Sequence, residues 1–361
     1  MNEMSPYIDF QHVSKLFGKF KALDDVSLSI PKGTFMTLLG PSGCGKTTLM
    51  RQLAGFSEPD SGDIYLKGKR VNGLPPYKRG TPLVFQEYAL FPHMTVFENI
   101  SYGLRLKKLP KEEVSKRVAQ MLEMFNLVGL EGRFPKQLSG GQQQRVAFAR
   151  ALIMGQDVLL LDEPLSNLDA KLRVDVRSEL RQIQQSLKIS VIYVTHDQDE
   201  ALSMSDYIAV MRGGRIEQVG TPWQIYFQPV NRFVADFVGT VNFLEADVTR
   251  NSNGCIAVRY QGMHAEIPSK VETPAGGRVT LVVRPECMRL VSEEEETHEA
   301  LLTGEIERYS FLGRVIRYWV KAGDATLIID DSNPDLTGPK TGNVRIAFDL
   351  KKMHVLKAEG S

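Results

Sequence analysis

The stretch GPSGCGKT, Gly40 to Thr47, constrains the fold of this chain more than any other part of the sequence. It fits the pattern G-x-x-x-x-G-K-S/T and follows the apolar run FMTLL, which predicts a buried strand, a glycine-rich loop and then a helix. In such a loop, consecutive backbone N–H groups and the positive end of the helix dipole converge on phosphate oxygens. The sequence therefore predicts an α/β unit whose first helix begins at a phosphate-binding loop.

Within this loop, two side chains have expected roles beyond those of the backbone. Lys46 is expected to reach the β and γ phosphates of a nucleotide, and the Thr47 hydroxyl to contact Mg²⁺. Cys44 is interpreted as a small filler whose position near a helix N-terminus can lower its pKa, so that alkylation would block nucleotide binding. The residues expected around the nucleotide in this segment are Gly40, Pro41, Ser42, Gly43, Cys44, Gly45, Lys46, Thr47 and Thr48.

Two further runs, VLLLDEP from Val158 and SVIYVTHD from Ser190, are almost wholly apolar until they end in charged residues. Such runs are typical of strands buried on both faces of a parallel sheet, and open α/β sheets bind ligands at the carboxyl ends of their strands. Asp162 is expected to hold Mg²⁺ through water, and Glu163 to orient or deprotonate an attacking water.

His196 and Gln86 follow strands in the same way. His196 ends the SVIYVT run and can contact a γ-phosphate as a neutral hydrogen-bonding group. Gln86 follows the short run LVF and can contact Mg²⁺ or the attacking water. Taken alone, a histidine in this place is more often structural, and a glutamine indicates nothing.

A second glycine-led helix start occurs far downstream, in LSGGQQQRVAFARAL from Leu138. Ser139, Gly140 and Gly141 at a helix N-terminus have the donors to cover a phosphate group. The alternative is that Ser139 only caps its own helix, which explains the serine and leaves the glycines and glutamines unexplained.

Together these motifs resemble the ATP-binding cassette (ABC) ATPases, over nearly all of residues 5–238, and LSGGQQQR is the signature sequence of that family. The resemblance implies an α/β fold: a phosphate-loop NTPase cassette with a RecA-like core, an antiparallel β subdomain and a helical subdomain at about residues 88–155. It also implies that the protein is an enzyme that hydrolyses ATP, with Mg²⁺ as cofactor.

The resemblance also implies roles for individual residues. Phe17 stacks on adenine, Gln86 is the Q-loop residue, Glu163 the catalytic base, and His196 the switch histidine. Ser139, Gly140, Gly141 and Gln142 of the signature, with Asp169 of the D-loop, contact ATP in a dimer in which two copies of the chain enclose two nucleotides. Thr47, Gln86 and, through water, Asp162 hold the Mg²⁺ ion.

The spacing of apolar residues changes near residues 238–242. Before that point, between Pro110 and Leu130, the apolar residues have helical spacing, which predicts an amphipathic helix packed on the core. Beyond residue 242, runs such as CIAVRYQ, RVIRYWV and NVRIAFDL alternate instead, and predict about 120 residues of antiparallel β structure, in a barrel or sandwich. The predicted domains are 1–238 and 239–361, and the acidic run Glu293 to Glu296 is expected to be a solvated turn.

The second domain resembles the all-β regulatory domain of bacterial importer ATPases, of the TOBE or OB-like kind. Such importers carry sugars, polyamines, ferric iron, sulfate or phosphonates. Sugar-importer cassettes commonly have a G-S-P-x-M-N type sequence at the domain junction, whereas this chain has GTVNFL from Gly239, which favours the polyamine and ferric-iron group. The sugar, sulfate and phosphonate importers remain alternatives.

Composition restricts the partners. With 44 Lys and Arg against 43 Asp and Glu, the net charge is +1, so no bulk field favours nucleic acid or anionic lipid. The three widely spaced cysteines match neither a disulfide framework nor a zinc site and fit a reducing cytosol. No apolar run approaches the roughly 18 residues of a membrane span. Exporters of the family that this chain resembles commonly carry their spans in the same polypeptide, so the resemblance implies a separate permease, with this chain bound at the cytoplasmic face of a bacterial inner membrane.

The segment EYALFPHMTVFENISYGL resembles the helical subdomain of importer cassettes, whose groove receives a short helix of the permease. By that resemblance Phe91, Pro92 and Met94 are candidates for the docking surface, and ordinary packing is the alternative for each of them. A solute-binding protein outside the cell is expected as an indirect partner. A soluble, nucleic-acid-associated cassette protein is the alternative of another class. The run RYSFLGRVIRYWV does interleave arginines with aromatics, but the near-zero net charge and the acidic run argue against nucleic acid as a partner.

Overall fold

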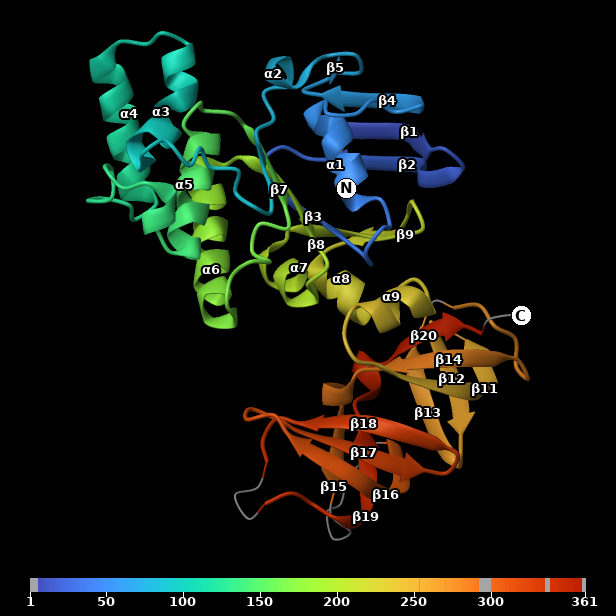
Figure 1. The fold of residues 1–361 in the computed structure, drawn as a ribbon. Coiled ribbons are helices and arrows are strands. Elements are labelled where there is room, and N and C mark those ends of the chain that lie inside the picture. The colour runs from blue at the N-terminus through green and yellow to red at the C-terminus, as the bar shows by residue number, and fades with distance from the viewer. Residues whose placement is uncertain (1–5, 253, 270, 292–299, 335–337, 359–361) are drawn as a thin grey trace. The chain divides into compact units, whose positions relative to one another are not determined.

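The computed structural model describes residues 6–252, 254–269, 271–291, 300–334 and 338–358. It consists of two compact units, Met1–Pro222 and Trp223–Ser361, each described below by itself (Figure 1). Helices α8 (Pro222–Phe227) and α9 (Arg232–Phe237) therefore go with the second unit almost entirely. The boundary at 238/239 stays a prediction about where the cassette sequence ends. The acidic run 293–296 lies outside the described residues.

A six-stranded sheet in the order β10-β9-β3-β8-β7-β6 forms the centre of the first unit. Neighbouring strands are parallel except for the β9–β10 pair, which is antiparallel. The strands are β3 (Phe35–Leu39), β6 (Leu83–Val84), β7 (Val158–Asp162), β8 (Ser190–Thr195), β9 (Tyr207–Arg212) and β10 (Arg215–Gly220). The parallel sheet predicted from the apolar runs is thereby confirmed.

The strands β3, β7 and β8 at the centre of this sheet are buried along their whole length, which explains why they are apolar without alternation. Leu159 and Leu161 of β7 belong to a core that they share with buried residues of the helices within residues 96–187. Val158 and Leu160 of the same strand belong to a second core, shared with helix α1 (Lys46–Ala54) and the antiparallel sheet. That sheet has the order β2-β1-β4-β5, with β1 (Ile8–Phe17), β2 (Phe20–Ile30), β4 (Ser61–Leu66) and β5 (Lys69–Arg70). It is followed by the short helix α2 (Pro76–Arg79).

The predicted helical region contains α3 (Val96–Leu106), α4 (Lys111–Met124), a 3₁₀ turn (Pro135–Gln137) and α5 (Gly140–Leu152). Figure 1 shows α3, α4 and α5 gathered on one side of the first unit, away from strands β1, β2 and β4. In α4 the buried residues Val114, Val118 and Leu122 recur every fourth position, as the sequence predicts, and Pro110 precedes the helix as its N-cap. Helices α6 (Ala170–Leu187) and α7 (Gln198–Met204) complete the unit.

The second unit is built from two five-stranded antiparallel sheets, β13-β12-β11-β14-β20 and β15-β19-β16-β17-β18. The first comprises β11 (Asn242–Ser252), β12 (Cys255–Tyr260), β13 (Met263–Pro268), β14 (Arg278–Val283) and β20 (His354–Lys357). The second comprises β15 (Met288–Val291), β16 (Ala300–Phe311), β17 (Ile316–Ala322), β18 (Ala325–Asp331) and β19 (Gly342–Phe348). One apolar core draws on both sheets, so the predicted all-β domain of the sandwich or barrel class is confirmed.

Arg284 links helices α8 and α9 to the strands of this unit through hydrogen bonds. It follows β14, is only 2% exposed, and donates to the backbone carbonyls of Tyr226, Ala235, Gly239 and Thr240. These bonds satisfy a buried guanidinium without any carboxylate, although burial lowers its pKa. Within the described ranges, no helix is long and apolar enough to cross a membrane.

Candidate functional site

Four strands of the parallel sheet end side by side and carry the predicted site residues at their carboxyl ends. In sheet order these strands are β3, β8, β7 and β6. β3 leads into the Gly40–Thr47 loop, β8 ends before His196, β7 ends at Asp162 and β6 ends before Gln86. Because the carboxyl ends of parallel strands lie at one edge, the fold brings these four segments together.

The loop after β3 is held tightly by its own side chain and by neighbouring strands. The buried Lys46 ammonium donates to the carbonyl oxygens of Gly40 (2.7 Å) and Pro41 (3.0 Å), so it lies within the curve of the loop. Gly45, the N-cap of α1, has φ 106°, and a Cβ there would lie 2.4 Å from the Ala22 carbonyl oxygen. Only glycine meets both conditions, so the last glycine of the motif is required by the backbone.

Cys44 differs from its expected chemistry. The thiol is buried, and burial raises its pKa although Lys46 lies 3.9 Å from the sulfur. The lowered pKa suggested by the helix N-terminus is therefore wrong, because the loss of solvent outweighs the nearby cation and the hydrogen bonds to the sulfur. The interpretation as a small filler fits, since its sulfur is buried against Gly40, where an added Cβ would lie only 2.7 Å from it.

Thr47 and Asp162 lie together at the start of α1 and the end of β7. The Thr47 hydroxyl donates a 2.9 Å hydrogen bond to Oδ1 of Asp162. Asp162 is 9% exposed, and desolvation raises its pKa in spite of this bond. A hydroxyl and a carboxylate in contact fit Mg²⁺, which proteins commonly bind through one or two carboxylates together with substrate phosphates. Among the described residues, no group of three acidic, histidine or cysteine side chains gathers into a metal site.

Glu163 has a left-handed backbone, with φ 47°. A residue with a Cβ pays about 1–2 kcal/mol for this conformation, and such strain concentrates at functional sites. The turn is held by the Glu163 N–H, which donates to the Val194 carbonyl (3.0 Å), and by the Ser166 hydroxyl, which donates to the Glu163 carbonyl (2.9 Å). It places the Glu163 carboxylate 3.2 Å from Nδ1 of His196, so the predicted base and the predicted phosphate sensor are in contact.

Gln86 is exposed, and its backbone is tied to the segment after β7. The side-chain amide of Asn167 donates to the Gln86 carbonyl oxygen at 3.0 Å. Asp169, two residues further, is the N-cap of α6 and accepts from the Leu172 N–H. The predicted Q-loop and D-loop segments are therefore neighbours.

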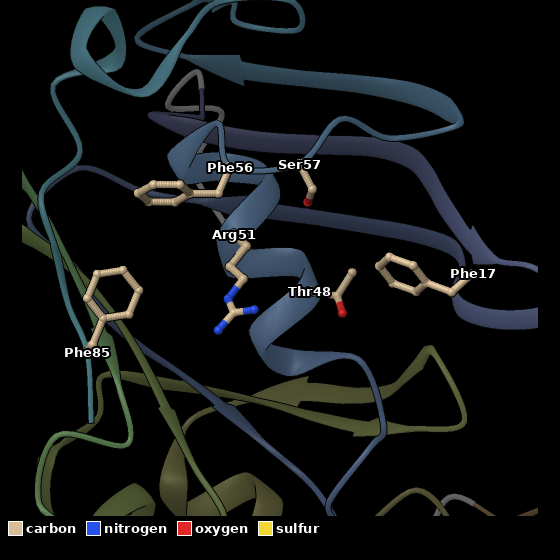
Figure 2. A pocket seen from close by; sticks show the side chains of 6 residues that line it. All are labelled: Phe17, Thr48, Arg51, Phe56, Ser57 and Phe85. Atoms are coloured by element: carbon tan, nitrogen blue, oxygen red, sulfur yellow. The ribbon is translucent and has the colours of Figure 1, made fainter. Parts of the chain in front are cut away.

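Beside the first turns of α1 lies a cavity of about 310 Å³ that includes two predicted residues, Phe17 and Thr48. Figure 2 shows Phe17 and Phe85 on opposite sides, with Thr48 and Arg51 projecting from the helix between them. The Phe17 side chain is 55% exposed, so its ring is available for stacking on a base. The sequence analysis did not identify Arg51, Phe56, Ser57 and Phe85 as lining residues, since nothing in their local pattern distinguishes them.

At the start of α5 the structure gives several signature residues local roles. Ser139 and Gln142 form a capping box, in which each side chain accepts from the backbone N–H of the other residue. The Gln144 side chain donates to the Pro164 carbonyl (2.9 Å). A Cβ on Gly141 would lie 2.8 Å from Leu172, so this glycine permits close packing on α6. Capping and packing therefore explain the glutamines and Gly141 of the motif as well as its serine. Ser139 and Gly140 are exposed to solvent.

The candidate residues for binding a permease or nucleic acid are only partly exposed to solvent. Phe91 is half-buried between Tyr102 (ring centroids 4.7 Å apart) and Arg150, whereas Pro92 is exposed and Met94 half-buried. In the run considered for nucleic acid, Arg317 forms two hydrogen bonds with Asp330 and Tyr318 is 1% exposed. Both side chains are engaged within the second unit.

A phosphate loop, a Mg²⁺-compatible carboxylate and an adjacent glutamate at one sheet edge define the first unit as a nucleotide-hydrolysing enzyme of the phosphate-loop class. Comparison with known families narrows the class. Residues 23–166 match the ABC transporter family, and residues 281–356 match the TOBE domain. The chain belongs to the ABC transporter ATPases, as its relatives below also show.

Curated relatives match both units. The chain is 46% identical over 332 residues, 91% of its length and 86% of the relative's, to the spermidine/putrescine import ATP-binding protein PotA of Thermobifida fusca (strain YX). It is 43% identical over 351 residues, 97% of its length and 98% of the relative's, to the Fe(3+) ions import ATP-binding protein FbpC of Rhizobium etli (strain ATCC 51251).

Solved structures confirm the cassette fold. CbiO1 from Clostridium perfringens, part of the ABC transporter complex cbiONQ, superposes with TM-score 0.58 and 30% identity, covering 62% of this chain and 91% of that one. The ATP-binding cassette MJ0796, in a dimeric post-hydrolysis state bound to ADP and Pi, superposes with TM-score 0.54 and 31% identity, covering 60% and 98%. The predicted α/β cassette, the ATPase class and the TOBE-type second domain are thereby confirmed.

Proposed function

We propose that this chain is the ATP-hydrolysing subunit of a bacterial importer for a polyamine or ferric iron. The observation that carries this proposal is the length of the similarity to import subunits. It extends over 97% of the chain for the ferric-iron relative and 91% for a polyamine relative, and so includes both units. The GTVNFL junction supports the same pair of solutes over sugars.

In the proposed mechanism, hydrolysis proceeds by in-line attack of water on the γ-phosphate. Glu163 accepts the proton of that water, His196 contacts the γ-phosphate, and Lys46 offsets charge that develops on the phosphate oxygens. The 3.2 Å contact between Glu163 and His196 supports this pairing. Thr47, Asp162 and Gln86 would hold Mg²⁺, which supplies charge neutralisation when it is bound.

Two copies of the chain are proposed to enclose two ATP molecules. Ser139, Gly140, Gly141 and Gln142 of one copy, with Asp169, face the nucleotide of the other. This is supported by the exposure of Ser139 and Gly140 at the N-terminus of α5, where backbone N–H groups favour an anion, and by the dimeric state of MJ0796. Closure then depends on bound ATP and reopening on its hydrolysis, because the γ-phosphate contributes contacts only in the closed state.

The remaining partners follow from the transport role. A separate permease is proposed to bind the surface that includes Phe91, Pro92 and Met94, which keeps the chain at the cytoplasmic face of the inner membrane. A solute-binding protein on the opposite side of the membrane acts indirectly through that permease. Nucleic acid is not a proposed partner.

Transport by the assembled complex tests this function. A candidate permease and solute-binding protein from the same organism would be co-expressed with this chain and reconstituted in vesicles containing ATP and Mg²⁺. Uptake would be measured for radiolabelled putrescine, spermidine, Fe³⁺, maltose, sulfate and a phosphonate, with Glu163→Gln as the control for ATP dependence. We expect uptake of a polyamine or of Fe³⁺ that is lost in the control. Uptake of maltose, sulfate or the phosphonate instead would overturn the solute assignment.

A further inference from the structure

The loop that follows Gln86 has a strained backbone. Tyr88 and Ala89 both have left-handed conformations, with φ 60° and 48°. Residues with a Cβ rarely adopt this conformation, and two in succession are held only where the surrounding groups determine them. The loop between β6 and α3 therefore depends on contacts from outside itself.

Those contacts come from the side chains of two other elements. Nη1 and Nη2 of Arg150, on α5, donate to the carbonyl oxygens of Ala89 (2.8 Å) and Tyr88 (2.9 Å). The Asn167 side-chain amide donates to the carbonyl oxygen of Gln86 at 3.0 Å. Three carbonyl groups within four residues are thus fixed by side chains from the signature helix and from the segment before α6.

Arg150 contacts an aromatic ring in addition to making these two hydrogen bonds. Its guanidinium lies 5.3 Å from the centroid of the Phe91 ring, and burial lowers its pKa. In the part of the chain that the structure describes, no carboxylate contributes to the pKa of Arg150, whose shift is caused by burial. A half-buried guanidinium whose partners are two carbonyls and a ring fits the task of holding a backbone, because its planar fork fixes the directions of its N–H groups, whereas the ammonium of lysine is a single charge on a flexible stem.

We infer that Arg150 is a positioning residue for Gln86. By fixing the carbonyls of Tyr88 and Ala89 it sets the direction in which the chain leaves Gln86, and it ties that direction to helix α5. A movement of α5, whose N-terminus is Ser139, then moves Gln86 as well. This inference rests on the proposed function, which places Gln86 at the Mg²⁺ ion.

The first test compares two arginines of the same helix. Arg150→Lys keeps the charge but loses the fork, whereas Arg145→Lys alters a similar two-bond contact, with Glu179 on α6, that does not touch the loop. In Arg150→Lys we expect kcat for ATP hydrolysis to fall roughly tenfold, since small misplacement of an aligned group is costly, with KM for ATP within about twofold. Arg145→Lys should keep both constants. Equal losses in the two variants would overturn the inference.

Hydrogen exchange of the full-length variants supplies a readout that is independent of activity. Peptides covering residues 86–91 should exchange faster in Arg150→Lys than in the wild type or in Arg145→Lys, because the clamped carbonyls are released. Unchanged exchange there would contradict the clamp. If Arg150→Lys does not fold, Asn167→Ala replaces it, since Asn167 is exposed and its side chain holds the Gln86 carbonyl.

A double-mutant cycle decides whether Arg150 acts through Gln86. In a Gln86→Ala background, Arg150→Lys should lower kcat by less than about twofold, because the group that it positions is already missing. A full tenfold loss in that background would overturn the inference. An unchanged kcat in Gln86→Ala alone would overturn the proposed role of Gln86 in hydrolysis, and the exchange measurement would still decide whether Arg150 holds the loop.

Discussion

The hydroxyl of Thr47 and the carboxylate of Asp162 are joined by a 2.9 Å hydrogen bond, which links the first turn of α1 to the end of β7. The two residues are separated by 115 positions in the sequence. Their contact joins the phosphate loop to the end of β7, which Glu163 follows, so that the two segments form a single site. Because burial raises the pKa of Asp162, the site also carries a cost for the ionised carboxylate that Mg²⁺ binding requires.

From this we predict that Asp162→Asn loses activity and gains stability. The amide oxygen can still accept from Thr47, but it supplies no charge to Mg²⁺, so hydrolysis should fall by roughly a hundredfold or more. With EDTA and without nucleotide, unfolding by urea at neutral pH should show that the variant is at least as stable as the wild type, since it lacks a buried charge whose desolvation outweighs its hydrogen bond and nearby cations. A clear loss of stability at neutral pH would contradict the cost assigned to the carboxylate.

The pH dependence of that difference has a defined sign. A carboxyl whose folded-state pKa is raised contributes stability that is fully present below the unfolded-state pKa and is lost as the pH rises through the folded-state pKa. Relative to Asp162→Asn, the wild type should therefore be most stable in acid and decline across the range just above the ordinary aspartate pKa. Denaturation of both proteins between about pH 4 and pH 8 measures this trend.

Glu163→Gln should separate binding from hydrolysis. The amide keeps the shape of the side chain beside His196 but cannot accept the proton of the attacking water, so kcat should fall by about 10²–10⁴-fold while ATP still binds. Phosphate release and equilibrium binding of a fluorescent ATP analogue measure the two properties. Glu112→Gln, a matched change at an exposed position on α4, should leave both unchanged. Retention of most of the wild-type turnover would remove Glu163 from the role of base.

The three cysteines should react in an order set by burial. Cys44 and Cys287 are buried, and burial raises the pKa of both thiols, that of Cys287 to about 11, whereas Cys255 is half-buried. Iodoacetamide at pH 8 should therefore modify Cys255 first, because the thiolate is the reactive form. Peptide mass spectrometry follows the three sites, with unfolded protein as the control in which all react. Early modification of Cys44 would restore the sequence-based expectation of a reactive thiol.

Arg284 should control the stability of the second unit. Arg284→Met keeps most of the side-chain volume but leaves the carbonyls of Tyr226, Ala235, Gly239 and Thr240 without their donor. Charge-assisted bonds contribute about 1.5–3 kcal/mol each, so a loss of roughly 3 kcal/mol or more is expected. Limited proteolysis should then cut within residues 223–241. Arg278→Met, at the start of β14 and 73% exposed at its side chain, is the control and should cost less than about 1 kcal/mol.

Features of the site that have a local sequence signal can be predicted, whereas features held by distant segments cannot. The strand ends that carry Asp162 and His196 are predictable because strands buried on both faces are apolar until they leave the sheet. The capping box of Ser139 and Gln142 also has a local signal, serine followed three residues later by glutamine, although only the serine was interpreted as a cap.

The left-handed turns at Glu163, Tyr88 and Ala89 have no such signal. They depend on donors and acceptors from distant segments, namely Val194 and Arg150, and no local preference of Glu, Tyr or Ala favours them. The same holds for the cavity beside α1, which Phe85 and Phe56 line from separate parts of the chain. The sequence therefore predicts which residues form the site better than it predicts how they are held.

The role of Ser139 between two copies of the chain can be tested apart from its role as a cap. In a Glu163→Gln background, the mass in solution should change from monomer to dimer when MgATP is added, because hydrolysis no longer reopens the dimer. Ser139→Asp keeps the helix cap, since aspartate caps as well as serine does, but it places a negative charge against the phosphate of the other copy. This variant should keep its melting temperature and remain a monomer.

Ser139→Ala is the matched control for that experiment. It removes the cap, at a cost of about 1 kcal/mol, and adds no charge, so it should be less stable and still dimerise with MgATP. If the aspartate variant dimerises as readily as its parent, the start of α5 does not face a phosphate and the capping box is the whole role of Ser139. If only the aspartate variant fails to dimerise, charge repulsion at the nucleotide is the cause, because the loss of the cap alone leaves the dimer intact.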